Sequence, residues 1–277
     1  MKNRAFRYSG NKLFLVDRVN SLIKEQLPDY KQYYEPFLGS GAIFYNLDSF
    51  DKSKQYYISD IDKNIITMHN AFIENDYSDY QFCLNLIESG YGDIKEDKEA
   101  YYAFRDAYNT MSDYNANKYK GLYLLMLANS CINSMLRFGP NGMNQSFGHR
   151  HYVLDEATFN EIKRRVSAEN TSLERMPYES MLNRRDLHNA IVFFDPPYQS
   201  REMTYNAGFS RHTFVRFLLT LTSQTNNLYM YTDIENEESD KLLLLGWNKE
   251  VVRTMRTTCP SKSSEKTGNE VLYYIRT

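Results

Sequence analysis

Residues 190–198 have the sequence Ala-Ile-Val-Phe-Phe-Asp-Pro-Pro-Tyr, in which five apolar side chains end abruptly at an acid and two prolines. A short apolar run of this kind predicts a strand that is buried on both faces, as in a parallel sheet. The prolines stop the strand and remove two backbone donors, so the segment presents acceptors, namely the Asp195 carboxylate and the Pro196 carbonyl. Ligands of α/β proteins bind at the carboxyl ends of strands, which makes this segment a candidate site.

Two further apolar runs end in the same way at small or acidic residues. Residues 33–37 precede the turn Gly39-Ser40-Gly41 and a helix start, and residues 55–59 precede Asp60. Amphipathic helical patterns cover residues 13–27 and 61–72. This alternation of strand and helix predicts the α/β class, with a Rossmann-like, doubly wound parallel sheet.

The middle of the chain departs from this alternation. Helical spacing covers residues 100–110, 119–132 and 156–167, and the acid-free, Gly- and Asn-rich stretch 137–150 predicts a turn or hairpin. We therefore predict a catalytic domain over residues 1–64 and 177–277, with an inserted, mainly helical domain over 65–176. Downstream we expect a loop, a helix, a strand and an antiparallel pair, at residues 199–211, 213–222, 228–231, and 250–254 with 270–275.

Charge is unevenly distributed in this chain of 277 residues with a net charge of −2. Residues 1–12, 115–154 and 251–268 carry net charges of +4, +4 and +3. If they converge, these segments form a basic face suited to a phosphate backbone; the alternative is three solvated surface segments.

Neither the cysteines nor the hydropathy pattern indicates a disulfide, a metal or a membrane. Cys83, Cys131 and Cys259 are far apart and form no C-x-x-C pair, so no disulfide and no structural metal are expected. The apolar runs are too short to span a bilayer, and no signal peptide is recognised. We therefore expect a cytoplasmic protein with no membrane partner.

The glycine turn and Asp60 favour a ligand that carries a ribose. Gly39 and Gly41 allow a ligand to approach the backbone, and Asp60 follows at about the spacing at which an acid binds ribose hydroxyls. The turn lacks the third glycine of dinucleotide-binding loops, which disfavours a nicotinamide dinucleotide.

The Asp-Pro-Pro-Tyr segment suits chemistry on an amino group. The lone pair of the adenine N6 amine is delocalised into the ring, and acceptors on both of its hydrogens would localise that lone pair for attack on a methyl sulfonium. Tyr198 offers a face on which an extruded base stacks, an interaction of roughly 1–3 kcal/mol. The alternative is a proline-rich strand end with a buried tyrosine.

These motifs, in this order, resemble the Dam-type DNA adenine N6-methyltransferases. The stretches 3–6 and 8–12 resemble that family's amino-terminal cofactor motif, and residues 37–41 its Phe-x-Gly-x-Gly loop. The resemblance implies a methyltransferase sheet, S-adenosylmethionine as cofactor with S-adenosylhomocysteine as product, no metal, and action on a flipped adenine in double-stranded DNA. We expect a monomer, because methylating one strand at a time needs no symmetry. It assigns catalysis to Asp195, Pro196, Pro197 and Tyr198, and cofactor contacts to Tyr8, Lys12, Phe37, Gly39, Gly41, Asp60 and Asp195.

The inserted segment is similar to the family's target-recognition hairpin over residues 133–138 and 142–148. The resemblance implies that Arg137 reads a guanine, that Arg7 occupies a second base-reading position, that Met135 and Leu136 act as wedges, and that Asn144 contacts DNA. The alternatives are a phosphate clamp at Arg137 and a core role for Met135-Leu136. Three features depart from the family's pattern, namely Ser134 for glycine, Ser146 for proline, and the pair Phe138-Gly139. All three lie in the hairpin, so the four-base site GATC is only the leading expectation.

Two other functions stay open on the sequence alone. One is the same chemistry on RNA adenine or on cytosine N4. The other is a non-catalytic DNA-binding protein that retains the fold. The host is either a bacterial cell or, if a phage encodes the chain, the phage's host cell.

Overall fold

The computed structural model describes residues 2–8, 10–111, 118–134, 136–148, 152–184, 187–198, 209–257 and 266–277, with the backbone alone for 255–257, 266 and 267. The chain forms two compact units. Unit 1 comprises Met1–Val16, Leu38–Asp48 and Asp60–Arg175, and unit 2 comprises Asp17–Phe37, Ser49–Ser59 and Met176–Thr277. The predicted domain division, with an insert over residues 65–176, is based on motifs and stays a prediction.

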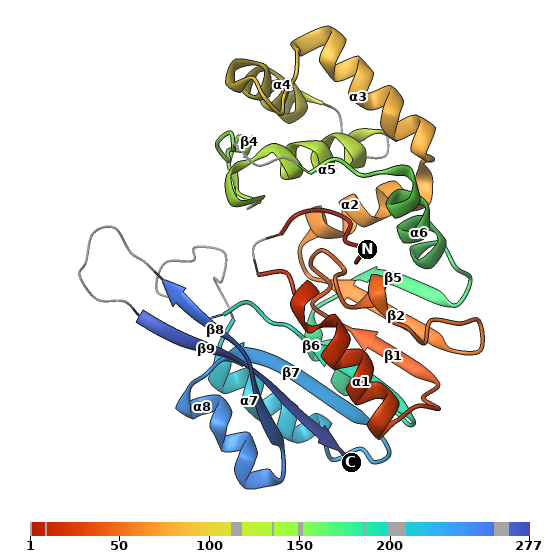
Figure 1. The fold of residues 1–277 in the computed structure, drawn as a ribbon, viewed down its shortest axis with the longest axis vertical. Helices are drawn as coiled ribbons and strands as arrows, with labels where there is room; N and C mark the ends of the chain where they lie inside the picture. Colours follow the sequence, from red (N-terminus) through yellow and green to blue (C-terminus); the bar gives the residue numbers. More distant parts are fainter. Residues whose placement is uncertain are drawn as a thin grey trace. The chain divides into compact units, whose positions relative to one another are not determined.

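Seven strands form one mostly parallel sheet (Figure 1) with the order β5-β2-β1-β6-β7-β9-β8. Pairing is parallel for β1 with β2, β1 with β6, and β6 with β7, and antiparallel for β9 with both β7 and β8. The predicted α/β class is confirmed. The strands are β1 (Gln32–Glu35), β2 (Gln55–Asp60), β5 (Thr171–Arg175), β6 (Ala190–Phe194), β7 (Leu228–Ile234), β8 (Asn248–Thr257) and β9 (Lys266–Arg276).

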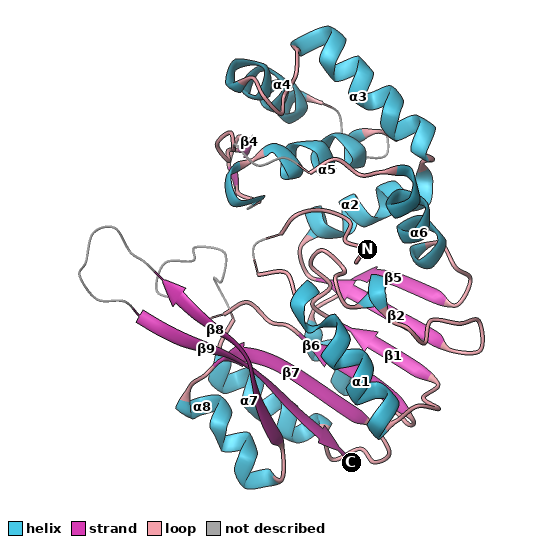
Figure 2. Ribbon diagram, in the orientation of Figure 1, coloured by secondary structure: helices cyan, strands magenta, loops and turns pink. Residues whose placement is uncertain are grey.

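Helices make up most of the remaining regular structure (Figure 2). They are α1 (Val16–Gln26), α2 (Lys63–Glu74), α3 (Tyr77–Tyr91), α4 (Lys98–Thr110), α5 (Lys120–Ser130), α6 (Glu156–Val166), α7 (Arg211–Leu221) and α8 (Glu237–Asp240). Among the described residues, none of these helices is long and apolar enough to cross a membrane.

Strand β6 forms the centre of the core of unit 2, because all five of its residues are buried. Helix α7 covers it with apolar side chains at helical spacing, including Phe214 and Leu218, and the Phe214 ring packs edge-on against Phe194 at 5.5 Å between centroids. This close packing fixes the carboxyl end of β6, where the Asp-Pro-Pro-Tyr segment begins.

Unit 1 is built on helix packing. Helix α5 is buried along almost its whole length, and a Cβ on Gly121 would lie 2.8 Å from the Thr67 carbonyl and 2.9 Å from the Ala71 Cβ, so α5 approaches α2 closely. Asp97 and Asp155 cap the amino ends of α4 and α6. The predicted helices over 100–110, 119–132 and 156–167 are confirmed as α4, α5 and α6.

The predicted hairpin is also present in unit 1. Strands β3 (Phe138–Gly139) and β4 (Gly142–Met143) pair antiparallel, and an isolated bridge between Cys131 and Phe147 closes the base of the loop. The hairpin is short, with two residues in each strand.

Three elements, α3, β5 and the short α8, are absent from the sequence-based prediction, and one expected element is much shorter. Helix α3 begins with a capping box formed by Asp76 and Asp79. Among its apolar residues it buries only Tyr80, Cys83 and Ile87, which explains why its sequence shows only a weak helical pattern of apolar residues. The helix expected after Gly41 is wrong, since only a 3₁₀ turn forms, over Phe44–Asn46.

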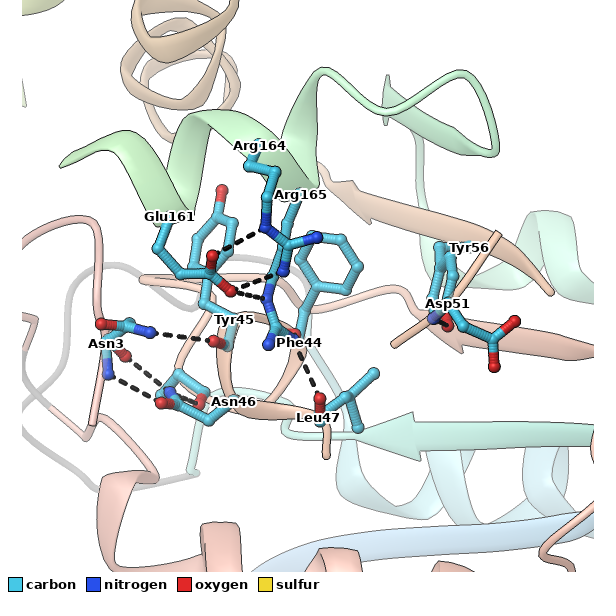
Figure 3. Close-up of polar contacts among 11 residues, drawn as sticks. Asn3, Phe44, Tyr45, Asn46, Leu47, Asp51, Tyr56, Glu161, Arg164 and Arg165 are labelled. Carbon is cyan, nitrogen blue, oxygen red and sulfur yellow. Dashed lines mark hydrogen bonds and ion pairs between the residues drawn. The ribbon is translucent and has the colours of Figure 1, made fainter. Parts of the chain in front are cut away.

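Arginine and asparagine side chains explain why this helix does not continue (Figure 3). The guanidinium of Arg165 on α6 donates to the carbonyls of Phe44 and Leu47, at 3.1 and 3.0 Å. Asn46 exchanges two hydrogen bonds of 2.7 Å with the backbone of Asn3. The Asn46 side chain also donates to the Ala42 carbonyl at 2.7 Å. Because these side chains satisfy carbonyls of the first turn, the chain leaves the helix without burying them unpaired.

Candidate active site

The Asp-Pro-Pro-Tyr segment directly follows β6 in unit 2 and is held at both ends by the next two strands. The Thr232 hydroxyl on β7 donates to Oδ1 of Asp195 at 2.8 Å. The Tyr198 hydroxyl donates to Oε1 of Glu270 on β9, whose side chain is buried. Since β7 and β9 are paired, with Ile234 opposite Glu270, the two contacts belong to one rigid ladder.

The environment of Tyr198 keeps its ring neutral. Burial raises the pKa of its hydroxyl well above the ordinary value, and the negative charges of Asp195 and Glu270 raise it further. The hydroxyl therefore remains a donor to Glu270. Within the segment, Pro196 is buried and Pro197 is exposed.

Phe37, also in unit 2, lies in an aromatic group beyond the carboxyl end of β1. Its ring stacks on Tyr178 with centroids 5.3 Å apart, and it packs edge-on against Phe209 and Phe214 at 6.4 and 5.8 Å. Phe37 is partly buried by these neighbours. Its predicted cofactor contact stays a prediction.

In unit 1 the amino-terminal segment packs against the glycine loop. The Ala5 amide donates to the Ser40 carbonyl at 3.2 Å. Gly39 and Gly41 have φ values of +49° and +71°, and a Cβ on Gly41 would lie 2.3 Å from the Tyr45 ring, so no side chain fits there. A Cβ on Gly39 would lie 3.4 Å from the Tyr8 ring, which places these two predicted cofactor residues side by side.

Asp60, the last residue of β2, binds the same loop. Its carboxylate accepts from the amides of Gly39 and Asp62, both at 3.0 Å. Burial raises the pKa of Asp60 to about 6, and the amide hydrogen bonds oppose that shift. Asp60 is therefore ionised at neutral pH and is neutralised by mild acid.

His69 on α2 also contacts the glycine loop. Burial lowers the pKa of its imidazole to about 4, so the ring is neutral. Nε2 lies 2.8 Å from the Gly39 carbonyl, and Nδ1 lies 2.7 Å from the Tyr45 hydroxyl. A carbonyl only accepts, so Nε2 carries the proton and Nδ1 accepts from Tyr45.

Lys12 is 3% exposed, and its ammonium group donates to the Gly10 carbonyl. A buried lysine is uncommon and indicates a site more often than a surface lysine does. A ligand that carries a carboxylate and ribose hydroxyls needs a cation, an acid and close approach to the backbone, which Lys12, Asp60 and the glycines at 39 and 41 offer. These residues therefore suit S-adenosylmethionine.

The hairpin presents two of the predicted DNA contacts. Arg137 and Asn144 are exposed and bond to each other, with Nε of Arg137 at 2.8 Å from Oδ1 of Asn144 and Nη2 at 3.2 Å from its carbonyl. Leu136 is 4% exposed, so a wedge role requires that it leave its packed position; Met135 lies outside the described residues. The backbone amide of Arg7 donates to Asn129 on α5 at 3.0 Å.

The backbone before the hairpin is left-handed at two consecutive residues. Asn133 and Ser134 have φ values of 55° and 48°. Glycine tolerates this region best, and Ser134 is the position at which the Dam-type pattern has glycine. This departure therefore places a strained residue at the entrance to the hairpin.

Among the described residues, no group of three His, Cys, Asp or Glu side chains gathers in a way that could hold a metal ion. Cys83 and Cys131 are buried. The predicted site residues divide between the units: Tyr8, Lys12, Gly39, Gly41 and Asp60 belong to unit 1, and Phe37 and Asp195–Tyr198 belong to unit 2.

A family model described as the D12 class N6 adenine-specific DNA methyltransferase matches residues 8–216. The chain belongs to this family. It is 26% identical to the DNA adenine methylase of Salmonella typhimurium, over 91% of this chain and 83% of the relative. It is 28% identical to the DNA adenine methylase of Escherichia coli K12, over 74% and 68%, and 23% identical to a type II methyltransferase of Methanocaldococcus jannaschii, over 72% and 70%.

In this methyltransferase, three residues that contact the predicted site were not predicted from the sequence. Thr232 and Glu270 hold the Asp-Pro-Pro-Tyr segment, and His69 holds the glycine loop. For Thr232, its position near the end of a strand was an available signal. Glu270 lies 72 residues beyond Tyr198 and gives no comparable signal, because strand pairing alone brings it close.

Proposed function

We propose that this DNA adenine methyltransferase acts on an adenine that is extruded from double-stranded DNA, with S-adenosylmethionine as the methyl donor and no metal. The observation that supports this most directly is the Asp-Pro-Pro-Tyr segment at the end of β6, with both of its functional side chains fixed by β7 and β9.

Asp195 and Pro196 act as acceptors for the target amine. The carboxylate and the Pro196 carbonyl accept hydrogen bonds from the two N6 hydrogens, which localises the nitrogen lone pair. Thr232 orients the carboxylate by donating to Oδ1. Pro197 stiffens the segment, and Tyr198 offers its ring face to the base, with its hydroxyl held by Glu270.

Each of the predicted cofactor residues has a distinct role in binding. Asp60 accepts from ribose hydroxyls, Lys12 pairs with the carboxylate, and the bare backbone at Gly39 and Gly41 allows close approach, while Tyr8 and Phe37 supply aromatic surface. When bound, S-adenosylmethionine supplies an electrophilic methyl group on a sulfonium. Asp195, the remaining predicted cofactor contact, contributes a negative charge.

DNA recognition falls to the predicted inserted domain, residues 65–176, together with Arg7. In this proposal Arg137 reads a guanine, Asn144 contributes at the DNA surface, and Met135 and Leu136 act as wedges beside the extruded base. GATC is the target sequence we would test first. The protein acts as a monomer in the cytoplasm, without a membrane partner.

One experiment tests the chemistry. The purified chain is incubated with labelled S-adenosylmethionine and with unmethylated duplex DNA, single-stranded DNA or RNA in separate reactions, followed by digestion to nucleosides and mass spectrometry. We expect N6-methyladenine in duplex DNA, and sequencing of the product then gives the target site. N4-methylcytosine, label on RNA alone, or DNA binding without any transfer would each contradict the proposal.

A further inference from the structure

The recognition hairpin contains a side-chain pair that constrains how Arg137 can contact DNA. Its guanidinium bonds twice to one residue, Asn144, through Nε and Nη2. A guanidinium has five N–H groups in a planar fork, one on Nε and two on each Nη. The contacts with Asn144 therefore use one N–H on Nε and one on Nη2, both on the same edge of the plane.

The remaining edge has the geometry that guanine requires. Nη1 and Nη2 each retain an N–H at the end of the side chain, and a pair of parallel N–H groups matches the O6 and N7 acceptors of guanine. Arg137 is exposed, and its side-chain contacts with Asn144 leave this edge unused.

Asn144 is itself fixed by the hairpin. Its backbone amide donates to the Arg137 carbonyl at 3.0 Å, and the adjacent Met143 exchanges two hydrogen bonds with the side chain of Asn109 on α4, at 2.8 and 2.9 Å. The backbone directly before Asn144 is thus connected to helix α4.

Gly139 provides the space for the Asn144 amide. A Cβ on Gly139 would lie 2.8 Å from Nδ2 of Asn144, closer than carbon atoms pack against a neighbouring group. The pair Phe138-Gly139 was one of the departures from the Dam-type pattern. In this chain the departure has a physical consequence, because any side chain at 139 displaces the amide that holds Arg137.

We propose that Asn144 is a positioning residue for base recognition, which holds the Nε edge of Arg137 so that its Nη1–Nη2 edge meets a guanine. Asn144 contributes to specificity through Arg137 and reads no base of its own. The inference rests on the proposed base-reading role of Arg137.

The test measures discrimination rather than activity alone. Full-length wild type, Arg137→Ala, Asn144→Ala, Asn144→Asp and Gly139→Ala are assayed for kcat/KM on the mapped duplex site and on duplexes changed at one base pair at a time. A duplex with 7-deazaguanine removes the N7 acceptor at each guanine in turn. Asn141→Ala, an exposed asparagine in the same hairpin, is the matched control.

Arg137→Ala should relax discrimination at one base pair, and 7-deazaguanine at that position should slow the wild type. Asn144→Ala and Gly139→Ala should lower discrimination about 5- to 10-fold at that same pair and leave the other positions unchanged. Asn144→Asp should keep discrimination, since a carboxylate still binds the Nε edge, while DNA binding weakens and becomes less salt-dependent because positive charge is neutralised. Asn141→Ala should match the wild type.

Three outcomes would overturn the inference. A loss that is equal across all duplexes in Asn144→Ala would indicate a phosphate contact, and a loss at a different base pair would indicate direct reading by Asn144. Unchanged discrimination in Asn144→Ala would show that Arg137 needs no support. In all three cases Arg137→Ala still relaxes one base pair, whereas a uniform loss in Arg137→Ala itself would refute the base-reading role on which the inference rests.

Discussion

The Asp-Pro-Pro-Tyr segment and the recognition hairpin are supported in opposite ways. The segment continues a fully buried strand, and its functional side chains bond to strands of seven and eleven residues. The hairpin has two residues in each strand, and its exposed Arg137 is held by the equally exposed Asn144. In the proposed function, chemistry therefore depends on the sheet, while specificity depends on a few surface contacts that can change without disturbing the sheet.

The largest effect should come from the segment itself. Asp195→Ala removes the charged acceptor and should lower the single-turnover rate by roughly 10²- to 10³-fold or more, as the loss of one preorganised polar group does in other enzymes. Equilibrium binding to the mapped duplex should remain largely intact. Measurable turnover close to the wild-type rate would show that the reacting amine lies elsewhere.

Loss of the hydrogen bond from Thr232 to Asp195 should have the second-largest effect on the rate. Thr232→Val keeps the shape of the side chain but removes the donor to Asp195, and hydrogen bonds to charged groups contribute about 1.5–3 kcal/mol. We expect kcat to fall about 10- to 100-fold with little change in the KM for DNA. Thr232→Ser, which retains the hydroxyl, should recover most of the rate; if both variants are equally slow, the hydroxyl has no positioning role.

The hairpin should respond with altered specificity instead. Arg137→Ala should cost roughly 1–3 kcal/mol of discrimination at one base pair. Its rate on the relaxed set of sites should stay within the range of the wild type, because the sheet is untouched. Sequencing of methylated random-sequence DNA gives the result directly, and an unchanged site preference would remove Arg137 from recognition.

Mild acid should weaken the binding of S-adenosylmethionine by protonating Asp60, the last residue of β2. The pKa of Asp60 is raised to about 6 by burial, so protonation below that pH removes its acceptor, and affinity for S-adenosylmethionine should fall by up to about tenfold per pH unit. The effect on folding has the opposite sign. Because the folded-state pKa lies above the ordinary 3.8, the contribution of Asp60 to the free energy of unfolding should rise as the pH falls from about 6 to about 4.

Calorimetric titrations between pH 5 and pH 8 measure the affinity for S-adenosylmethionine. Asp60→Asn is the control, and its affinity should not change with pH. An affinity that is independent of pH in the wild type would argue against a ribose contact at Asp60.

The smallest effect concerns the strained entrance to the hairpin. Ser134→Gly should raise the free energy of unfolding by about 0.5–1 kcal/mol, since glycine adopts a φ of +48° without a steric penalty. Thermal unfolding should shift by a few degrees, whereas Ser134→Ala should not stabilise the protein. A destabilised glycine variant would show that the left-handed backbone carries little strain.

Local pattern was enough to predict most of the fold. The strands at 55–60 and 190–194 have apolar runs that end at acids, and α4, α5 and α6 show helical spacing, so short-range chemistry specifies them. The helix expected after Gly41 was wrong because Arg165, 121 residues from Phe44, satisfies the carbonyls of its first turn. Long-range partners of this kind leave no trace in a local pattern.

The sequence by itself determined the α/β class, the order of the motifs and the chemistry that Asp195-Pro196-Pro197-Tyr198 suits, because each depends on residues adjacent along the chain. The tertiary structure alone decided which groups orient that chemistry. Glu270 reaches Tyr198, Thr232 reaches Asp195 and His69 reaches Gly39 through strand pairing and helix packing. Arg137 and Asn144 are close in sequence, yet their contact depends on the fold of the hairpin, since a hydrogen bond requires atoms within about 3 Å whatever their separation along the chain.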